Sequence, residues 1–247
     1  MNITEMSAWR RLTDADRHAL LAGPDSALWI ERLARYGFPE AQLLLGQLLL
    51  DRHPGPARGV AYGWIAAAAA AGHPPAINLM GRCLEHGWDV AADPAAAVAC
   101  YRQAADAGYD WAQFNLGCAL LYGIGTARDR PAAFAWFARA AAQGLAKAHN
   151  MLGRFHEQGW DRSPSRPRAA FHYRTAAERG DFRGQFNLAS LLHRQGRTGE
   201  AIAWLRRAIA TGSPDFLAET RDILAHNDDP ALRLVASEAD ARLRTGI

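Results

Sequence analysis

The chain has 247 residues, of which 49% are hydrophobic and 21% charged, and its formal net charge is +3. The apolar share and the ordinary totals of 22 glycines and 12 prolines exclude a disordered or collagen-like chain, and 28 cations against 25 anions are too slight an excess to indicate nucleic-acid binding. No apolar run reaches the roughly 20 residues of a membrane span, and the first residues lack the apolar core of a signal peptide, so we expect a cytoplasmic protein without a membrane segment.

A capping hairpin is predicted at the start of the chain. Residues 13–22 and 25–36 are predicted as two helices, and the second carries Trp29 and Gly37 in the phase of the repeats that follow. The ends of a stack of repeats need a polar outer surface. We therefore assign residues 1–38 to an N-terminal cap.

Five repeats follow over residues 39–212. One series of glycines has spacings of 35, 36, 36, 36 and 32 residues, namely Gly37, Gly72, Gly108, Gly144, Gly180 and Gly212. A second series has spacings of 35, 36 and 36, namely Gly46, Gly81, Gly117 and Gly153, and continues at Ala189. Self-similarity at one period in independent phases indicates a repeat architecture.

Each repeat is predicted as two helices. The first has a small residue at its centre, where a partner helix can approach closely. The second begins near a proline in three repeats (Pro94, Pro131 and Pro167), and a terminal glycine closes it in the left-handed conformation. The connecting loops are short, so neighbouring helices must be antiparallel, and no alternating apolar pattern predicts a strand.

A closing hairpin is predicted after Gly212. Residues 215–226 and 229–244 form its two helices, and the acids before Pro230 are a helix-start signal. Residues 213–247 are therefore assigned to a C-terminal cap, which makes the whole chain, 1–247, a single solenoid domain.

The pattern resembles the Sel1-like repeat family, a relative of the tetratricopeptide repeats with longer loops. The resemblance rests on the third repeat, with Ala112-Gln113-Phe114-Asn115-Leu116-Gly117, Leu121-Tyr122-Gly123-Ile124-Gly125, Trp136-Phe137 and Gly144. It implies an all-α, right-handed α-solenoid, or superhelix, of antiparallel helix pairs. It also implies protein–protein interaction in general terms. Our hypothesis is a non-catalytic scaffold or adaptor that binds a peptide or helix of another protein in its concave groove.

The resemblance also predicts which residues line that groove. In the related tetratricopeptide fold, the first helix of each repeat faces inward, at positions three before, one after and four after its central small residue. The second and fourth repeats then offer the same polar triplet, Asn78, Arg82 and Glu85 in one and Asn150, Arg154 and Glu157 in the other. The third repeat offers Phe114 and Leu121, and the fifth Phe186, Ser190 and His193.

Two interpretations of these residues stay open. The triplets either bind a ligand, the asparagines holding its backbone and the arginines a carboxylate, or are duplicated surface with Arg and Glu paired three residues apart. Trp88 and Trp160 occur in alternate loops, as rim anchors of the groove or as rings folded back over their own hairpins.

The sequence carries no catalytic or cofactor motif. It has no nucleophile elbow, phosphate loop or paired-cysteine motif. His149 and His156 lie seven residues apart, but two nitrogens without a third ligand do not predict a metal site. We therefore expect no enzyme, no cofactor and no metal. The alternative function is RNA binding, because helical repeats of this length bind single-stranded RNA and arginines cluster near Arg168.

Overall fold

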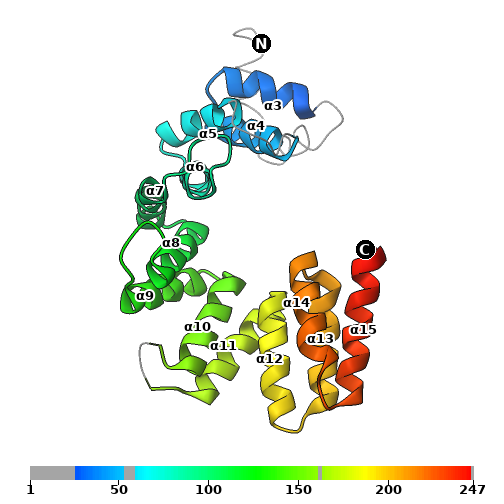
Figure 1. Ribbon diagram of the computed structural model, residues 1–247. Coiled ribbons are helices and arrows are strands. Elements are labelled where there is room, and N and C mark those ends of the chain that lie inside the picture. Colours follow the sequence, from blue (N-terminus) through cyan, green and yellow to red (C-terminus); the bar gives the residue numbers. More distant parts are fainter. Residues whose placement is uncertain (1–25, 53–58, 161–162, 246–247) are drawn as a thin grey trace. The chain divides into compact units, whose positions relative to one another are not determined.

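The computed structural model describes residues 26–52, 59–160 and 163–245, and within them it contains thirteen α-helices and no strand (Figure 1). The first helix of the predicted N-terminal cap, residues 13–22, lies outside the described residues. The chain forms two compact units, Met1–Asp129 and Arg130–Ile247. None of the described helices combines the length and apolar character that a membrane crossing requires.

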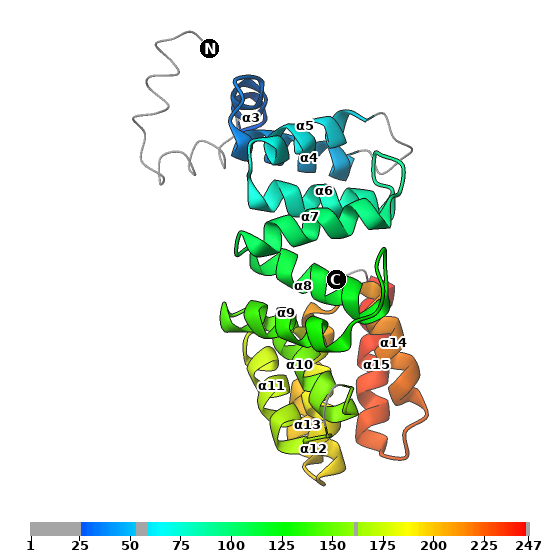
Figure 2. The ribbon, with the colours of Figure 1, turned by 90° about the vertical axis from the view of Figure 1, so that its left-hand side faces the viewer.

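The first unit is a stack of antiparallel helices in which each helix packs on the next (Figure 2). Its helices are α3 (Ser26–Arg35), α4 (Pro39–Arg52), α5 (Val60–Ala70), α6 (Pro74–His86), α7 (Pro94–Asp106) and α8 (Asp110–Tyr122). The first helices of successive repeats, here called A helices, also contact one another, α4 with α6 and α6 with α8. The A helices of this unit therefore form one layer.

The second unit follows the same plan. Its helices are α9 (Arg130–Ala142), α10 (Ala146–Gln158), α11 (Arg166–Glu178), α12 (Phe182–Arg194), α13 (Thr198–Thr211), α14 (Pro214–Ala225) and α15 (Pro230–Thr245). The A helices α10 and α12 touch, and α14 and α15 pair as the predicted closing hairpin. The predicted all-α solenoid of antiparallel helix pairs is confirmed.

Mid-helix glycines allow the two helices of a repeat to approach closely. A Cβ at Gly81 would lie 2.7 Å from Cε1 of Tyr101, and a Cβ at Gly153 would lie 2.4 Å from Cδ1 of Tyr173. Both tyrosines belong to the second, or B, helix of their repeat and are fully buried. The glycines therefore make room for the largest side chains of the core.

The predicted left-handed helix closure holds for five of the six terminal glycines and is wrong for Gly212. Gly37, Gly72, Gly108, Gly144 and Gly180 have φ between 79° and 96°. Gly212 instead has φ −68° and ψ 149°, because α14 starts immediately after it with Ser213 as N-cap and Pro214 in the first turn. The left-handed residue of the fifth repeat is Gly196, at the loop between its two helices.

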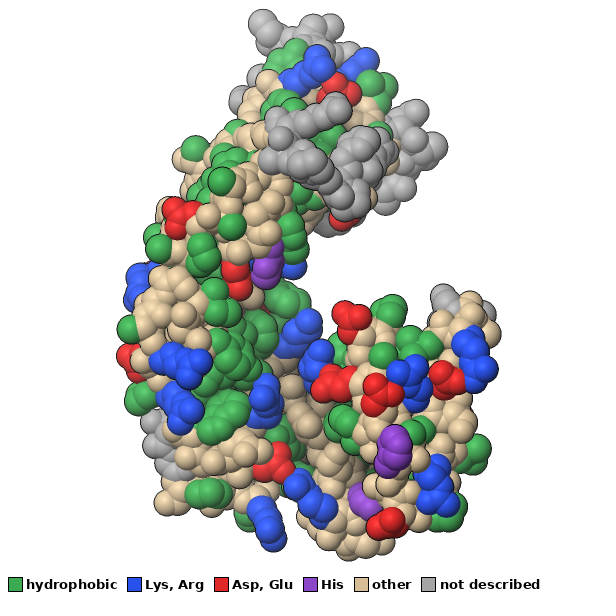
Figure 3. All heavy atoms as spheres, viewed as in Figure 1, with side chains coloured by type: hydrophobic (Ala, Val, Ile, Leu, Met, Phe, Trp, Pro, Cys, Tyr) green, Lys and Arg blue, Asp and Glu red, His purple; other side chains and the backbone are tan. Residues whose placement is uncertain are grey.

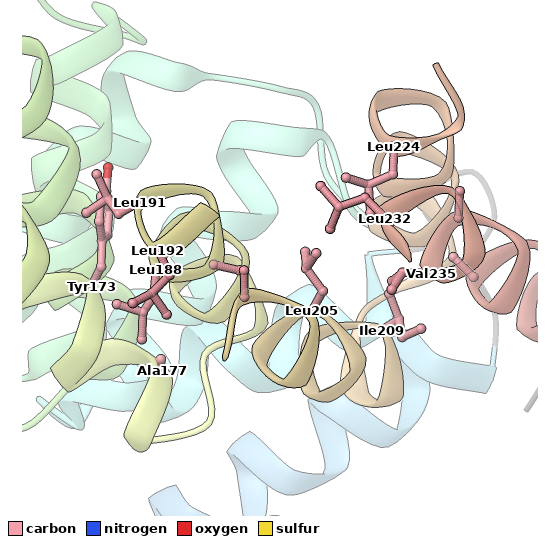
Figure 4. Packing of buried hydrophobic residues seen from close by; sticks show 14 of the residues in the cluster. Tyr173, Ala177, Leu188, Leu191, Leu192, Leu205, Ile209, Leu224, Leu232 and Val235 are labelled. Carbon is pink, nitrogen blue, oxygen red and sulfur yellow. The ribbon is translucent and has the colours of Figure 1, made fainter. Parts of the chain in front are cut away.

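The hydrophobic core of the second unit runs through α11, α12, α13, α14 and α15. Figure 4 shows Leu224 and Leu232, from the two helices of the closing hairpin, lying across from Leu205 of α13. Leu205, Leu224 and Leu232 are all buried. The closing hairpin thus completes the apolar surface of the fifth repeat, as a cap must.

Asp89, in the loop between α6 and α7, supplies the N-terminal cap of α5 from 30 residues away. Gly59, the N-cap residue of α5, has no side chain, and the Asp89 carboxylate accepts hydrogen bonds from the amides of Gly59 and Tyr62, both at 3.0 Å. These amides would otherwise lack partners at the positive end of the helix. Asp89 has φ 56°, a conformation that Asp and Asn tolerate better than most residues.

Asp89→Ala is expected to lower the free energy of unfolding by about 1–2 kcal/mol, because it removes the cap and places alanine at positive φ. Asp89→Asn retains an oxygen acceptor and the backbone tolerance, and should lose less than half as much. Urea unfolding followed by circular dichroism measures both values. Equal losses in the two variants would show that capping is not what Asp89 contributes.

Candidate binding site

The asparagines of the two polar triplets join neighbouring A helices. Asn115 Nδ2 of α8 donates to Asn78 Oδ1 of α6 over 2.8 Å, and Asn187 Nδ2 of α12 donates to Asn150 Oδ1 of α10 over the same distance. Asn78 and Asn150 are buried. In both units, therefore, the predicted backbone-binding asparagine is bonded to the next repeat.

The glutamates of the triplets bind the buried tyrosines of their own hairpins. Tyr101 donates to Glu85 over 2.6 Å, and Tyr173 donates to Glu157 over 2.7 Å. Burial, followed by the bond to the glutamate, raises the pKa of each tyrosine above its ordinary value. Glu157 also forms an ion pair with Arg194 of α12.

The arginines of the triplets stack on the loop tryptophans. The guanidinium carbon of Arg82 lies 4.8 Å from the ring centroid of Trp88, and that of Arg154 lies 5.1 Å from Trp160. Both tryptophans therefore lie against their own A helices, where Trp88 also contacts His86 with ring centroids 4.7 Å apart. Arg82 and Trp88 are exposed, whereas Arg154 and Trp160 are half-buried.

The apolar positions of the third repeat occupy different depths. Leu121 is 6% exposed and belongs to the core. Phe114 is half-buried and meets Trp111 of the same helix edge-on, with ring centroids 6.4 Å apart. Trp111, which is 40% exposed, was not selected from the sequence, although it stands three residues before Phe114 and hence on the same helix face.

The groove positions of the fifth repeat line a pocket of about 180 Å³. Phe186, Ser190 and His193 all contribute to it from α12. The other lining residues come from α12, from the three helices that follow and from the loop between α14 and α15, namely Ala189, Arg194, Leu205, Ile223, Leu224, Asn227 and Leu232. The pocket thus has an apolar floor and a rim with polar groups, on a unit whose visible face mixes hydrophobic, basic and acidic side chains (Figure 3).

Three histidines cluster between α10 and α11. The Nδ1 atoms of His149 and His172 lie 3.1 Å apart, and His156 stacks on His172 with ring centroids 5.5 Å apart and an interplanar angle of 12°. Burial, followed by the charges of the neighbouring His149 and His156, lowers the pKa of His172 to about 4. Burial and then the nearby Arg179 lower the pKa of His149.

Within the described part of the chain, no three or more His, Cys, Asp or Glu side chains are arranged to hold a metal ion. The Nδ1 atoms of His149 and His172 instead face each other, so one of them must carry a proton and the other a lone pair. The hydrogen bond between these two rings therefore requires that the accepting ring be neutral.

The stacked A helices, central glycines and buried tyrosines define an α-solenoid with hydrogen bonds between repeats. The Sel1 repeat model matches four segments, residues 74–109, 112–145, 146–181 and 183–213, which together make up more than half of the chain. The chain belongs to the Sel1 repeat family. Proteins built of these repeats generally serve as protein-interaction scaffolds.

Solved structures show the same fold. A Sel1 repeat protein from Oxalobacter formigenes is 23% identical over the full length of both chains, with a TM-score of 0.71. The protective antigen c5321 of uropathogenic Escherichia coli, which displays an SLR fold, is 25% identical over 90% of this chain, with a TM-score of 0.65. This chain spans about half of that protein, 49% of its length. The immunity protein Pa5087 from Pseudomonas aeruginosa is 14% identical, with 84% of this chain and 81% of that one covered and a TM-score of 0.58.

Proposed function

We propose that this protein is a non-catalytic scaffold or adaptor that binds a peptide or helix of another protein on its A helices. The observation that carries the proposal is the pocket on α12, because the three residues that the repeat phase assigns to a groove in the fifth repeat all line it. Their spacing puts all three on one face of α12, and a pocket on that face supports the proposal. Among the other assigned positions, Arg82 and Phe114 supply a charged and an aromatic group on A helices of the first unit.

The chemistry of the pocket suits one apolar side chain of a peptide. Its floor contains Leu205, Leu224 and Leu232, which would bury such a side chain against closely packed carbon. Ser190, His193 and Asn227 supply hydrogen-bonding groups on the same lining for the peptide backbone beside it. Apolar anchors surrounded by polar groups are the usual arrangement at protein interfaces.

Ile223 provides a direct test because it lines the pocket and is also 51% exposed. Ile223→Glu places a charge at the pocket without removing a core side chain. Leu234→Glu is the matched control, since Leu234 is 55% exposed on α15 and is absent from the pocket lining. Peptides are selected from a display library against the full wild-type chain. They should bind the Ile223 variant at least about tenfold more weakly than wild type, a loss of about 1.4 kcal/mol, and bind the control variant within about twofold of wild type.

Two results of this experiment would contradict the proposal. One is a library that yields no binding peptide, and the other is equal binding by the two variants. Single-stranded RNA is measured alongside at two salt concentrations. Strong retention of RNA that falls steeply with salt would favour the alternative, an RNA-binding helical repeat.

A further inference from the structure

Arg82 is a guanidinium that stacking holds in place and that has no acidic partner among the described residues. It lies exposed on α6, one helical turn beyond Asn78, and stacks on Trp88 at 4.8 Å. Trp88 is itself contacted by His86, at 4.7 Å between ring centroids. Stacking restrains the planar guanidinium while leaving its N–H edge available, so less conformational entropy is lost when a ligand binds.

The two carboxylates closest to Arg82 in the chain accept hydrogen bonds from other groups. Glu85, the partner that helical spacing would give Arg82, accepts the hydroxyl of the buried Tyr101. Asp89, next to Trp88, caps α5 through the amides of Gly59 and Tyr62. Among the described residues, Arg82 forms no ion pair.

The A helix that packs next to α6 carries aromatic side chains. The bond from Asn115 to Asn78 holds α8 against α6, and α8 carries Trp111 and Phe114 near its start and the exposed Tyr122 at its end. A segment lying across α6 and α8 would therefore meet a fixed positive charge next to apolar rings. The complementary segment has an acidic side chain flanked by apolar ones.

A similar stacking arrangement occurs in the described part of the second unit. Arg154 stacks on Trp160, and Glu157 is occupied by Tyr173 and Arg194. The arrangement is therefore built twice, 72 residues apart, from an arginine, a loop tryptophan and a tyrosine that holds the intervening glutamate. Arg154 is half-buried, whereas Arg82 is exposed, so the first unit offers the more accessible copy.

We propose that Arg82, held by Trp88, binds a carboxylate of the partner, and that the first unit thereby selects acidic peptide segments with apolar flanks. This inference rests on the proposed function, because it names the chemistry of the partner that the A helices of the first unit would bind. It makes Arg82 a specificity-determining residue. The stacked tryptophan is a positioning residue that orients the guanidinium.

The experiment uses the full chain and peptides from an unbiased display library, resynthesised with each Glu or Asp in turn replaced by Gln or Asn. Wild-type protein should select acidic peptides, and the neutral versions should bind at least about tenfold more weakly. Arg82→Gln should remove this discrimination, while Arg82→Lys, which keeps the charge but loses the planar stack, should give an intermediate value. Arg102→Gln, at an exposed position on the B helix α7, is the control and should discriminate like wild type.

Each outcome separates this inference from the function on which it rests. Peptides that bind wild type and lose affinity with Ile223→Glu, but show no acidic preference, would overturn the role of Arg82 and leave the scaffold intact. Discrimination that persists in Arg82→Gln would do the same. A library without any binding peptide would contradict both proposals. RNA binding that depends on Arg82 would overturn the acidic peptide as the ligand and assign Arg82 to RNA instead.

Discussion

Gly125→Ala is expected to lower the free energy of unfolding by at least about 3 kcal/mol. Gly125 has φ +66°, where an L side chain is strained, and an added Cβ would lie 2.0 Å from the carbonyl oxygen and 2.3 Å from the carbonyl carbon of Pro94. Both are backbone atoms at the first turn of α7, so no rotamer change relieves the overlap. The penalty combines backbone strain with overpacking, each costing about 1–3 kcal/mol.

The first unit contains a matched control at Gly63. This glycine is exposed on α5 and does not have a positive φ. A Cβ added to it would have no other atom within 4 Å. Gly63→Ala should therefore raise the free energy of unfolding by about 0.5–1 kcal/mol through helix propensity. Urea unfolding of both variants gives the comparison, and a Gly125 variant as stable as wild type would contradict the close packing of this loop.

Gly125 and Asp89 occupy equivalent positions in neighbouring repeats, 36 residues apart, and explain an alternation visible in the sequence. The loop of the second repeat carries Trp88-Asp89 where the third has Ile124-Gly125. In the structure, Asp89 reaches back to cap α5, whereas Gly125 packs against the start of α7. Both residues join the loop after an A helix to the B helix of the preceding repeat. The alternation therefore reflects two ways of making one contact.

Much of the fold could be predicted from periodicity, because helix pairing depends on local features that repeat. A central glycine predicts close approach of a partner helix, and the structure places Tyr101 against Gly81. The predicted left-handed conformation of Gly212 was wrong because its conformation depends on the start of α14, which follows it directly. Gln113 Nε2 donates to the carbonyl oxygen of Ala105, and Gln42 and Gln185 make the matching bonds in their own repeats. The recurrence of glutamine at this phase is the sequence signal for these bonds.

The candidate site was less predictable, because its bonds connect residues far apart in the chain. The sequence offers Arg82 and Glu85 as a pair three residues apart, but Tyr101, 16 residues on, binds Glu85 in the structure. Asn78 finds its partner 37 residues away. The pocket also needs Ile223 and Asn227 of the closing hairpin, which lie outside the repeats and have no repeat phase.

Lowering the pH from about 7 to 4 is expected to destabilise the second unit through the histidine cluster. Burial lowers the pKa of His172 to about 4, whereas an unfolded chain would protonate it near 6.5. The unfolded state therefore binds more protons within this interval, so stability is complete above about 6.5 and falls until the pH reaches about 4. The full shift corresponds to about 3 kcal/mol, which solvent screening at the half-buried ring reduces to about 2 kcal/mol.

The geometry of the cluster explains why protonation is costly there. A second proton would break the bond between the Nδ1 atoms of His149 and His172 and place two imidazolium rings together, with Arg179 adding a further positive charge. His172→Phe removes the ring that contacts both other histidines, so its unfolding free energy should fall by about 2 kcal/mol less than that of wild type between pH 7 and 4. The carboxylates titrate in both proteins, so the difference between them isolates the cluster. His226→Gln, at the exposed end of α14, serves as the control and should follow wild type. Urea unfolding at several pH values measures the free energy of unfolding of each protein. If the plots of this free energy against pH ran parallel for His172→Phe and wild type, the cluster would not govern acid stability.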